Sequence, residues 1–217
     1  MTSTNGRTKL WLVGKGEQTR QAIVAQALDL ASSGGLESLS IGELAKAVGM
    51  SKSGLFAHFK SKEQLQLDVL EAAVARFIDK VVTPALREPR GEPRVRAMFE
   101  RWLVWERDEF PGGCVIEGAA EELLDRPGPV RDYVVRAQHD WMDAIATAVR
   151  IAMSEGHFRP DLDPEQLAFE LLTLFLGYHR HGRLFDREQA ETRTRSAFGS
   201  LVVRARSPGS GRARTTP

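Results

Sequence analysis

Two short predicted helices joined by a glycine turn constrain this chain more than any other feature of its sequence. Ser40 and Glu43 have the spacing of a capping box, in which a serine N-cap precedes a glutamate by three residues, and they open a helix over 41–48. Gly49 ends that helix, and Ser51 supplies the N-cap of the next one. A helix, a tight glycine turn and a second helix are typical of a helix-turn-helix unit, whose second helix enters the major groove of DNA.

Charge is divided unevenly along the chain. Residues 1–62 contain eight Lys/Arg and four Asp/Glu, a net +4, and the remaining residues carry −3 within a formal total of +1. Lys46, Lys52, Lys60 and Lys62 surround the glycine turn. A basic N-terminal part on a mildly acidic body favours a polyanionic partner for the first part only.

Helical periodicity of apolar residues continues through the rest of the sequence, and no strand is predicted. The fold class is therefore all-α, with about nine helices in an N-terminal three-helix helix-turn-helix DNA-binding domain and a larger helical body. Pro84 is expected to end the fourth helix, and 87–93 is expected to be a linker. The predicted helices span 17–32, 41–48, 51–59, 61–84, 95–108, 114–124, 130–155, 164–178 and 187–206.

The expected domain organisation follows these helices. We predict a flexible N-terminal arm over 1–16, the helix-turn-helix domain over 17–62, the helical body over 63–206 with a connecting helix over 63–83, and a disordered tail over 207–217. No window approaches the roughly 18 consecutive apolar residues of a membrane helix. A single cysteine cannot form an internal disulfide and fits a reducing compartment, so we expect a cytoplasmic protein without a membrane partner.

The segment SKSGLFAHFKSKEQL, which runs from Ser51 to Leu65, resembles the signature of the TetR/AcrR family of transcriptional regulators. The resemblance covers about residues 17–65. It implies DNA contacts from the start of the second helix, from the third helix and from the start of the fourth. Phe56 stands where the family usually has tyrosine, so a phosphate hydrogen bond from that hydroxyl is absent. The implied DNA-binding residues are Ser40, Ser51, Lys52, Ser53, Gly54, Phe56, His58 and Lys62.

The resemblance also implies a function for the body, which would be a larger helical ligand-binding and dimerisation domain. It predicts a homodimeric repressor that binds double-stranded DNA at a palindromic operator and is released by an unidentified small apolar or amphipathic ligand. The last two long helices, about 164–178 and 187–206, would form a four-helix bundle with the partner. Their apolar stripes suit that role, because each would be exposed in an isolated protomer.

Aromatic and sulfur-containing side chains at helical spacing in the body are candidates for the ligand pocket, although the same spacing is typical of an ordinary core. Trp102 and Trp141 are the preferred pair. Cys114 follows two glycines at a predicted helix N-terminus, where the helix dipole would lower the pKa of its thiol. It is either a redox-sensing thiol or a small buried side chain. The full set of pocket candidates is Met98, Phe99, Trp102, Trp105, Cys114, Trp141 and Phe175.

Other functions leave weaker traces in the sequence. Cys114 and His139 are a conceivable nucleophile and base, but nothing orients them, and no phosphate-binding loop or hydrolase motif is present, so no catalytic residue is expected. His179 and His181 diverge on a helix, so neither a metal site nor a cofactor is predicted. A DNA-binding protein that responds to a protein partner, or to none, is the remaining alternative.

Overall fold

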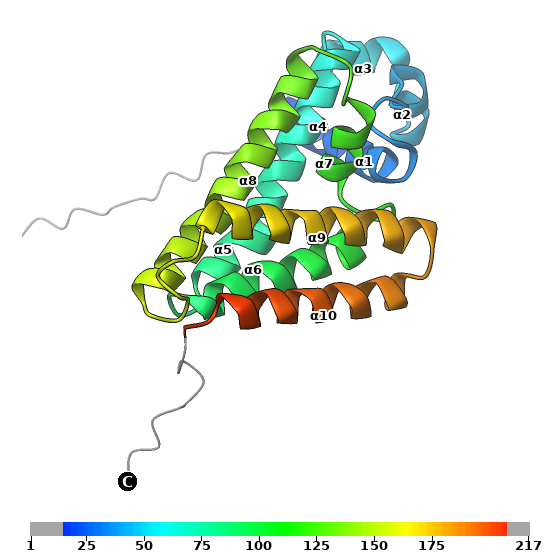
Figure 1. Cartoon of the computed structure of the whole chain (residues 1–217). Coiled ribbons are helices and arrows are strands. Elements are labelled where there is room, and N and C mark those ends of the chain that lie inside the picture. The colour runs from blue at the N-terminus through cyan, green and yellow to red at the C-terminus, as the bar shows by residue number, and fades with distance from the viewer. Residues whose placement is uncertain (1–14, 208–217) are drawn as a thin grey trace, which may run out of the picture.

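Helices make up the described part of the chain, which is residues 15–207 of a computed structural model (Figure 1). Within these residues there is no strand, and a single antiparallel bridge joins Phe158 to Arg206. The all-α fold class expected from the sequence is confirmed. The predictions for the N-terminal arm and the C-terminal tail fall almost entirely outside the described residues, and the described end of the arm, Lys15 and Gly16, is helical instead of flexible. None of the described helices is long and apolar enough to cross a membrane.

The described residues form nine continuous helices, two of which contain a π-helical segment. The first, α4, continues through η1 into α5, and α6 continues into η2. The elements are α1 (Lys15–Gly34), α2 (Ile41–Ala47), α3 (Lys52–His58), α4 (Lys62–Phe77), η1 (Ile78–Val82), α5 (Thr83–Leu86), α6 (Glu92–Val104), η2 (Trp105–Glu109), α7 (Val115–Glu122), α8 (Pro129–Ser154), α9 (Pro164–Leu184) and α10 (Arg187–Ala205).

The connecting helix does not end at Pro84, and that prediction is wrong. Helical backbone continues to Leu86, because the π-helical segment directly before the proline changes the hydrogen-bond register. The N–H of Thr83 bonds to the carbonyl of Ile78, five residues earlier. Proline usually breaks a helix because it has no N–H for the carbonyl four residues earlier and its ring clashes with that carbonyl. In the wider π-helical turn this four-residue hydrogen bond is not required.

Two further helix boundaries differ from the predictions by more than two residues. The predicted linker over 87–93 is shorter, since α6 begins at Glu92, with Gly91 at a φ of +97° before it and a proline in its first turn. Helix α9 continues beyond Tyr178 to Leu184. Burial of Tyr178 and His179 against the body accounts for this extension, because these side chains gain packing only if the helix persists.

The N-terminal head is built on α1, which packs against α2 and α4, while α2 packs against α3. Figure 1 shows α2 and α3 at one end of the long α4 helix and the α9–α10 pair toward its other end. Leu55 in α3 and Phe59 directly after it are completely buried. This very short helix is therefore stabilised by its contacts with the core. The rest of the head core includes Ile23, Ala27, Leu36, Leu39, Leu44 and Leu65.

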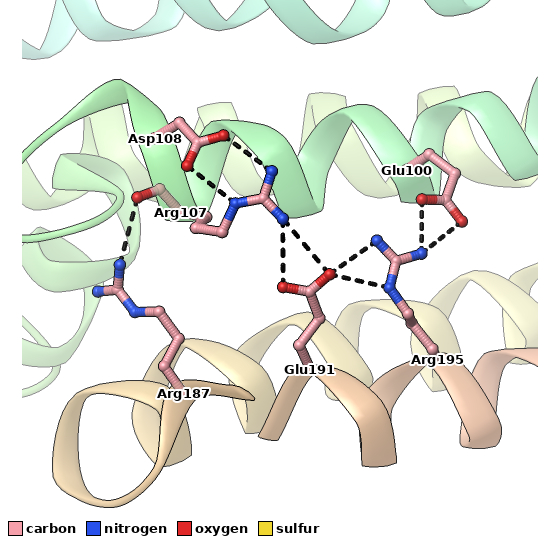
Figure 2. A network of polar contacts seen from close by, with 6 residues as sticks. All are labelled: Glu100, Arg107, Asp108, Arg187, Glu191 and Arg195. Carbon is pink, nitrogen blue, oxygen red and sulfur yellow. Dashed lines mark hydrogen bonds and ion pairs between the residues drawn. The ribbon is translucent and has the colours of Figure 1, made fainter. Parts of the chain in front are cut away.

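The body centres on α8, which contacts α4, α6, α7 and α9, and α10 packs along α9. A polar network on the surface ties η2 to α10 (Figure 2). Glu191 lies between Arg107 and Arg195, and Arg195 also holds Glu100 at 2.6 Å. Arg107 in turn forms paired hydrogen bonds of 2.8 and 2.9 Å to Asp108. These contacts secure the end of the α6–η2 helix, from which buried residues of the body project.

Candidate DNA-binding head and effector cavity

The turn between α2 and α3 has the geometry of a Schellman motif. The N–H of Met50 bonds to the carbonyl of Ala45 at 2.9 Å, and the N–H of Gly49 bonds to that of Lys46 at 3.3 Å. Gly49 has a φ of +66°, in the left-handed region that a glycine occupies without strain. The predicted helix, glycine turn and helix therefore exist as a locally specified unit.

Three serines start the helices around this turn. Ser40 Oγ accepts a hydrogen bond from the N–H of Glu43, Ser51 Oγ accepts one from Gly54, and Ser61 Oγ accepts one from Gln64, at 3.0–3.1 Å. In the predicted capping box, the Glu43 carboxylate accepts from the Ser40 hydroxyl instead of from its backbone N–H. Only half of that motif is formed, and the serine cap is the half that the helix needs.

The predicted DNA-binding residues gather on the exposed side of the head. Ser51, Lys52 and Ser53 in the first turn of α3 are exposed, and Gly54 is half-buried. The stem of Lys52 crosses α2, where a Cβ on Gly42 would lie 3.2 Å from its Cε. Among the described residues, no carboxylate lies within ion-pair distance of Lys52. The remaining predicted residues, Ser40, Phe56, His58 and Lys62, are exposed or half-buried.

Phe56 and Phe59 have opposite environments although they are three residues apart. Phe59 is fully buried, with Arg20 at 5.6 Å from its ring centroid, whereas Phe56 remains 53% exposed. A large apolar ring on the surface beside Ser53 and Lys52 is available for packing against a sugar or a base methyl group. The missing tyrosine hydroxyl does not remove this apolar contact surface.

The loop between α1 and α2 is clamped to the body by one carboxylate. Glu122 at the end of α7 accepts the backbone N–H groups of Leu36 and Glu37 at 3.0 and 2.7 Å. A side chain on Gly35 would clash with this carboxylate, and Gly35 also has a φ of +90°. The same loop is held from α4, since Lys62 Nζ donates to the Glu37 carbonyl at 2.5 Å. The head therefore contacts the body through both α4 and α7.

A largely apolar cavity of ≈ 260 Å³ lies between the connecting helix, α6, α7 and α8. Both preferred tryptophans, Trp102 and Trp141, line it, together with Phe77 and Cys114. Phe77 meets Trp141 edge to face, with ring centroids 4.9 Å apart. The other pocket candidates, Met98, Phe99, Trp105 and Phe175, are buried in the surrounding core and outside the lining of this cavity.

Cys114 is buried, and the expectation of a lowered thiol pKa is wrong. Burial raises its pKa well above the usual range, and the negative charges of Glu117 and Glu106 add to that effect. The helix dipole is outweighed because the thiol has left water. His139, the other half of the conceivable catalytic pair, is exposed on α8.

A buried ion pair lies behind Cys114. His179 Nδ1 is 2.8 Å from Glu106 Oε1, and both side chains are at most 4% exposed. Glu106 Oε2 also accepts the backbone N–H of Cys114 at 3.0 Å. Burial lowers the pKa of His179, but the hydrogen bond and charge of Glu106, together with the charge of Glu117, outweigh burial and raise it. His179, which lies two residues before His181, thus compensates the buried negative charge of Glu106.

Glu117 lines the cavity and is the residue that sequence reasoning missed. It is 3% exposed, and Gln138 Nε2 donates to its Oε2 at 3.0 Å. Burial raises the pKa of Glu117 to about 7, against the lowering effects of the Gln138 hydrogen bond and the His179 charge. An acidic residue in the first turn of a helix otherwise rich in apolar residues, VIEGAAEE, was the available signal.

Comparison with known proteins identifies the family of this chain. Residues 23–69 match the model of the bacterial regulatory proteins of the tetR family, and residues 91–198 match that of the tetracyclin repressor-like C-terminal domain. The HTH-type transcriptional regulator TcmR of Streptomyces glaucescens is 31% identical over 181 residues, which cover 79% of this chain and 73% of TcmR. The chain belongs to the TetR family.

Solved structures agree with this assignment. A TetR transcriptional regulator from Chloroflexus aurantiacus has 26% identity and a TM-score of 0.78 over 87% of this chain and 94% of that one. AibR in complex with isovaleryl coenzyme A and operator DNA has 25% identity and a TM-score of 0.64 over 81% and 95% of the two chains. The TetR-family protein described here is thus a DNA-binding transcriptional regulator, and its family is one of regulators and not of enzymes.

Proposed function

We propose that this regulator is a homodimeric repressor that binds a palindromic operator and leaves it when a small ligand fills the body cavity. The observation that carries the proposal is the position of α7, which lines the cavity at Ile116 and Glu117 and holds the head through Glu122. A ligand that displaces α7 changes the position of the α1–α2 loop and, with it, the position of α3, the helix that would enter the major groove. Cavity and head are thus linked through α7, in addition to α4, which lines the cavity at Val74 and Phe77.

The DNA contacts that we propose come from the head residues predicted by the sequence. Lys52 and Ser53 in the first turn of α3 face the base edges, where a lysine can donate to guanine. Lys62 and the free N–H groups at the start of α4 bind a phosphate. Lys62 gives up its bond to the Glu37 carbonyl to do so, which makes the α1–α2 loop sensitive to DNA as well as to α7.

The homodimer that we propose forms through α9 and α10. Five large apolar side chains remain more than 40% exposed on these helices and the residue that follows α9: Phe169, Leu176, Leu184, Phe185 and Val203. Exposed apolar groups concentrated on two neighbouring helices are typical of a surface that another chain covers. A second copy of the chain places a second reading head on the DNA, and a two-fold symmetric dimer requires a palindromic site.

The ligand of AibR does not transfer directly to this chain. Coenzyme A carries several phosphate charges, and among the residues that line the cavity here there is no lysine, arginine or histidine to bind them. We therefore propose a smaller, mainly apolar or amphipathic effector for this cavity.

A thermal-shift screen followed by a DNA-release assay tests the proposal. A compound that raises the unfolding temperature and also dissociates the protein from its operator supports a ligand-responsive repressor. If compounds bind without releasing DNA, or if none binds, a regulator that responds to a protein partner is favoured instead. Glu122→Ala should retain ligand binding while weakening the release of DNA, because the link between α7 and the head loop is removed.

A further inference from the structure

The charged groups that line the effector cavity are all acidic. Glu117 lies at its inner wall, and Asp140, an exposed residue of α8, lies at its rim. The rest of the lining is apolar or neutral. No lysine, arginine or histidine is present among these residues. An anionic ligand would therefore be repelled by two carboxylates, whereas a cationic ligand would find a negative counter-charge already in place.

Glu117 differs from the neighbouring buried carboxylate in having no positive partner at hydrogen-bond distance. Glu106 is compensated by His179 at 2.8 Å, but Glu117 receives only the neutral amide of Gln138, on Oε2. Of the residues described in the structure, none donates a hydrogen bond to its Oε1. A carboxylate that is 3% exposed, lines a cavity and retains an unused acceptor oxygen is prepared for a donor from outside the protein.

We propose that the effector is a monocationic, largely apolar amine whose ammonium group binds Glu117 and whose hydrocarbon part packs between Trp102 and Trp141. This inference rests on the proposed function, since it names the chemical class that the effector cavity takes. The ammonium donates to the unused oxygen of Glu117, and the aromatic rings of the lining give the hydrocarbon part an apolar surface to pack against. A cavity of ≈ 260 Å³ suits an amine with one ring or a short alkyl chain.

The same contact predicts that binding depends on pH. The ammonium binds the deprotonated carboxylate, and burial raises the pKa of Glu117 to about 7, so protonation competes with the ligand below that pH. The other groups that act on Glu117 are Glu121 on its own helix, Glu106 on η2 and His179 on α9. His179 loses its positive charge as pH rises, which also makes the site more attractive to a cation. Affinity for an amine therefore rises with pH through 7.

Three probes that share a phenylbutyl group test the inference on the purified full-length protein: 4-phenylbutylamine, 4-phenylbutanol and 5-phenylpentanoate. Calorimetry at pH 8 should show the amine binding about tenfold or more tightly than the alcohol, since the ammonium brings a positive charge to its hydrogen bond with the Glu117 carboxylate and the hydroxyl does not. The carboxylate should bind more weakly than the alcohol. Lowering the pH to 6 should weaken the amine by up to about tenfold, one power of ten for each pH unit below the pKa of Glu117.

Two variants separate the contact from general effects of charge. Glu117→Gln should abolish the advantage of the amine over the alcohol and remove the pH dependence of amine binding. Glu121→Gln makes the same change of charge on the same helix outside the cavity lining, and it should retain the preference for the amine. Each variant is first checked for a single cooperative unfolding transition, which shows that it is folded.

The inference is overturned if the alcohol or the carboxylate binds as tightly as the amine, if no probe binds, or if Glu117→Gln leaves the preference unchanged. A mobility-shift assay with each probe keeps this result apart from the proposed function. Release of DNA by a neutral or anionic compound would leave a ligand-responsive repressor standing and remove only the cationic effector. Failure of every compound to release DNA, with amine binding intact, would remove the proposed function instead.

Discussion

The reading head and the effector cavity both leave charge without a partner, but of opposite sign. In the head, Lys52 and Lys60 are exposed and, among the described residues, have no carboxylate within ion-pair distance. In the cavity, Glu117 is buried beside a neutral amide. The surface network between η2 and α10 is different, because Arg107 and Arg195 are both paired with carboxylates there (Figure 2). Unpaired positive charge attracts a polyanion to the head, and unpaired negative charge attracts a cation to the cavity.

Breaking a compensated pair should have the largest effect on stability. Glu106→Ala removes the partner of His179 and the acceptor of the Cys114 N–H, and we expect a loss of about 3–5 kcal/mol in the free energy of unfolding. Urea unfolding at pH 7 measures this loss. A change below about 1 kcal/mol would mean that His179 does not compensate the charge of Glu106 as a buried ion pair, and that Glu106 and Glu117 do not differ in this respect.

Removing the uncompensated charge should act in the opposite direction. Burial raises the pKa of Glu117 from 4.5 to about 7 in the folded state. The free energy of unfolding therefore falls as pH rises from about 4.5 to 7, because the buried carboxyl group has to lose its proton, and above that range the loss is constant. Glu117→Gln should therefore be more stable than the wild type at pH 8, by up to about 3 kcal/mol, and equally stable near pH 4.5. Urea unfolding at both pH values measures this, and a variant that is less stable at pH 8 contradicts it.

In the head, Lys52 should affect the sequence preference of DNA binding. If Lys52 donates to a guanine, Lys52→Ala loses about 1–3 kcal/mol of discrimination at one position of each half-site and less on unrelated DNA. Competition binding with single-base variants of the operator measures the change. An equal loss on every sequence would assign Lys52 to a phosphate.

Lys62 should have a smaller and uniform effect. Lys62→Ala removes one proposed phosphate contact per protomer, so specific and non-specific DNA should be weakened alike, and the dependence of log K on log salt should become shallower by about one for each phosphate that is no longer neutralised. Fluorescence anisotropy over a salt series measures the slope. Arg150→Ala, which removes an exposed arginine paired with Glu165 in the body, is the matched control and should leave the slope unchanged.

The head could be predicted from the sequence because its signals are local. Ser40, Ser51 and Ser61 cap helices within three residues of themselves, and Gly49 supplies the turn that its φ of +66° requires. These features do not depend on distant parts of the chain. The family resemblance then supplied the function that such a unit performs.

The cavity could be predicted only in part, because distant residues build it. Periodicity selects Trp102 and Trp141, but it does not distinguish a cavity wall from a packed core. Glu106 and His179 are 73 residues apart, and no local pattern joins them. The π-helical segment after α6 is also invisible to a 3.6-residue period. Burial then reverses the expected shift in the pKa of Cys114.

The most direct test of the central claim is a salt series of DNA binding on the sequence that flanks the gene of this protein. We predict a sequence-selective complex on a two-fold symmetric site, with an affinity that falls steeply as salt rises and a salt dependence that is shallower for Lys62→Ala. The absence of any salt-sensitive, sequence-selective complex would contradict the assignment of the unpaired head lysines to operator DNA.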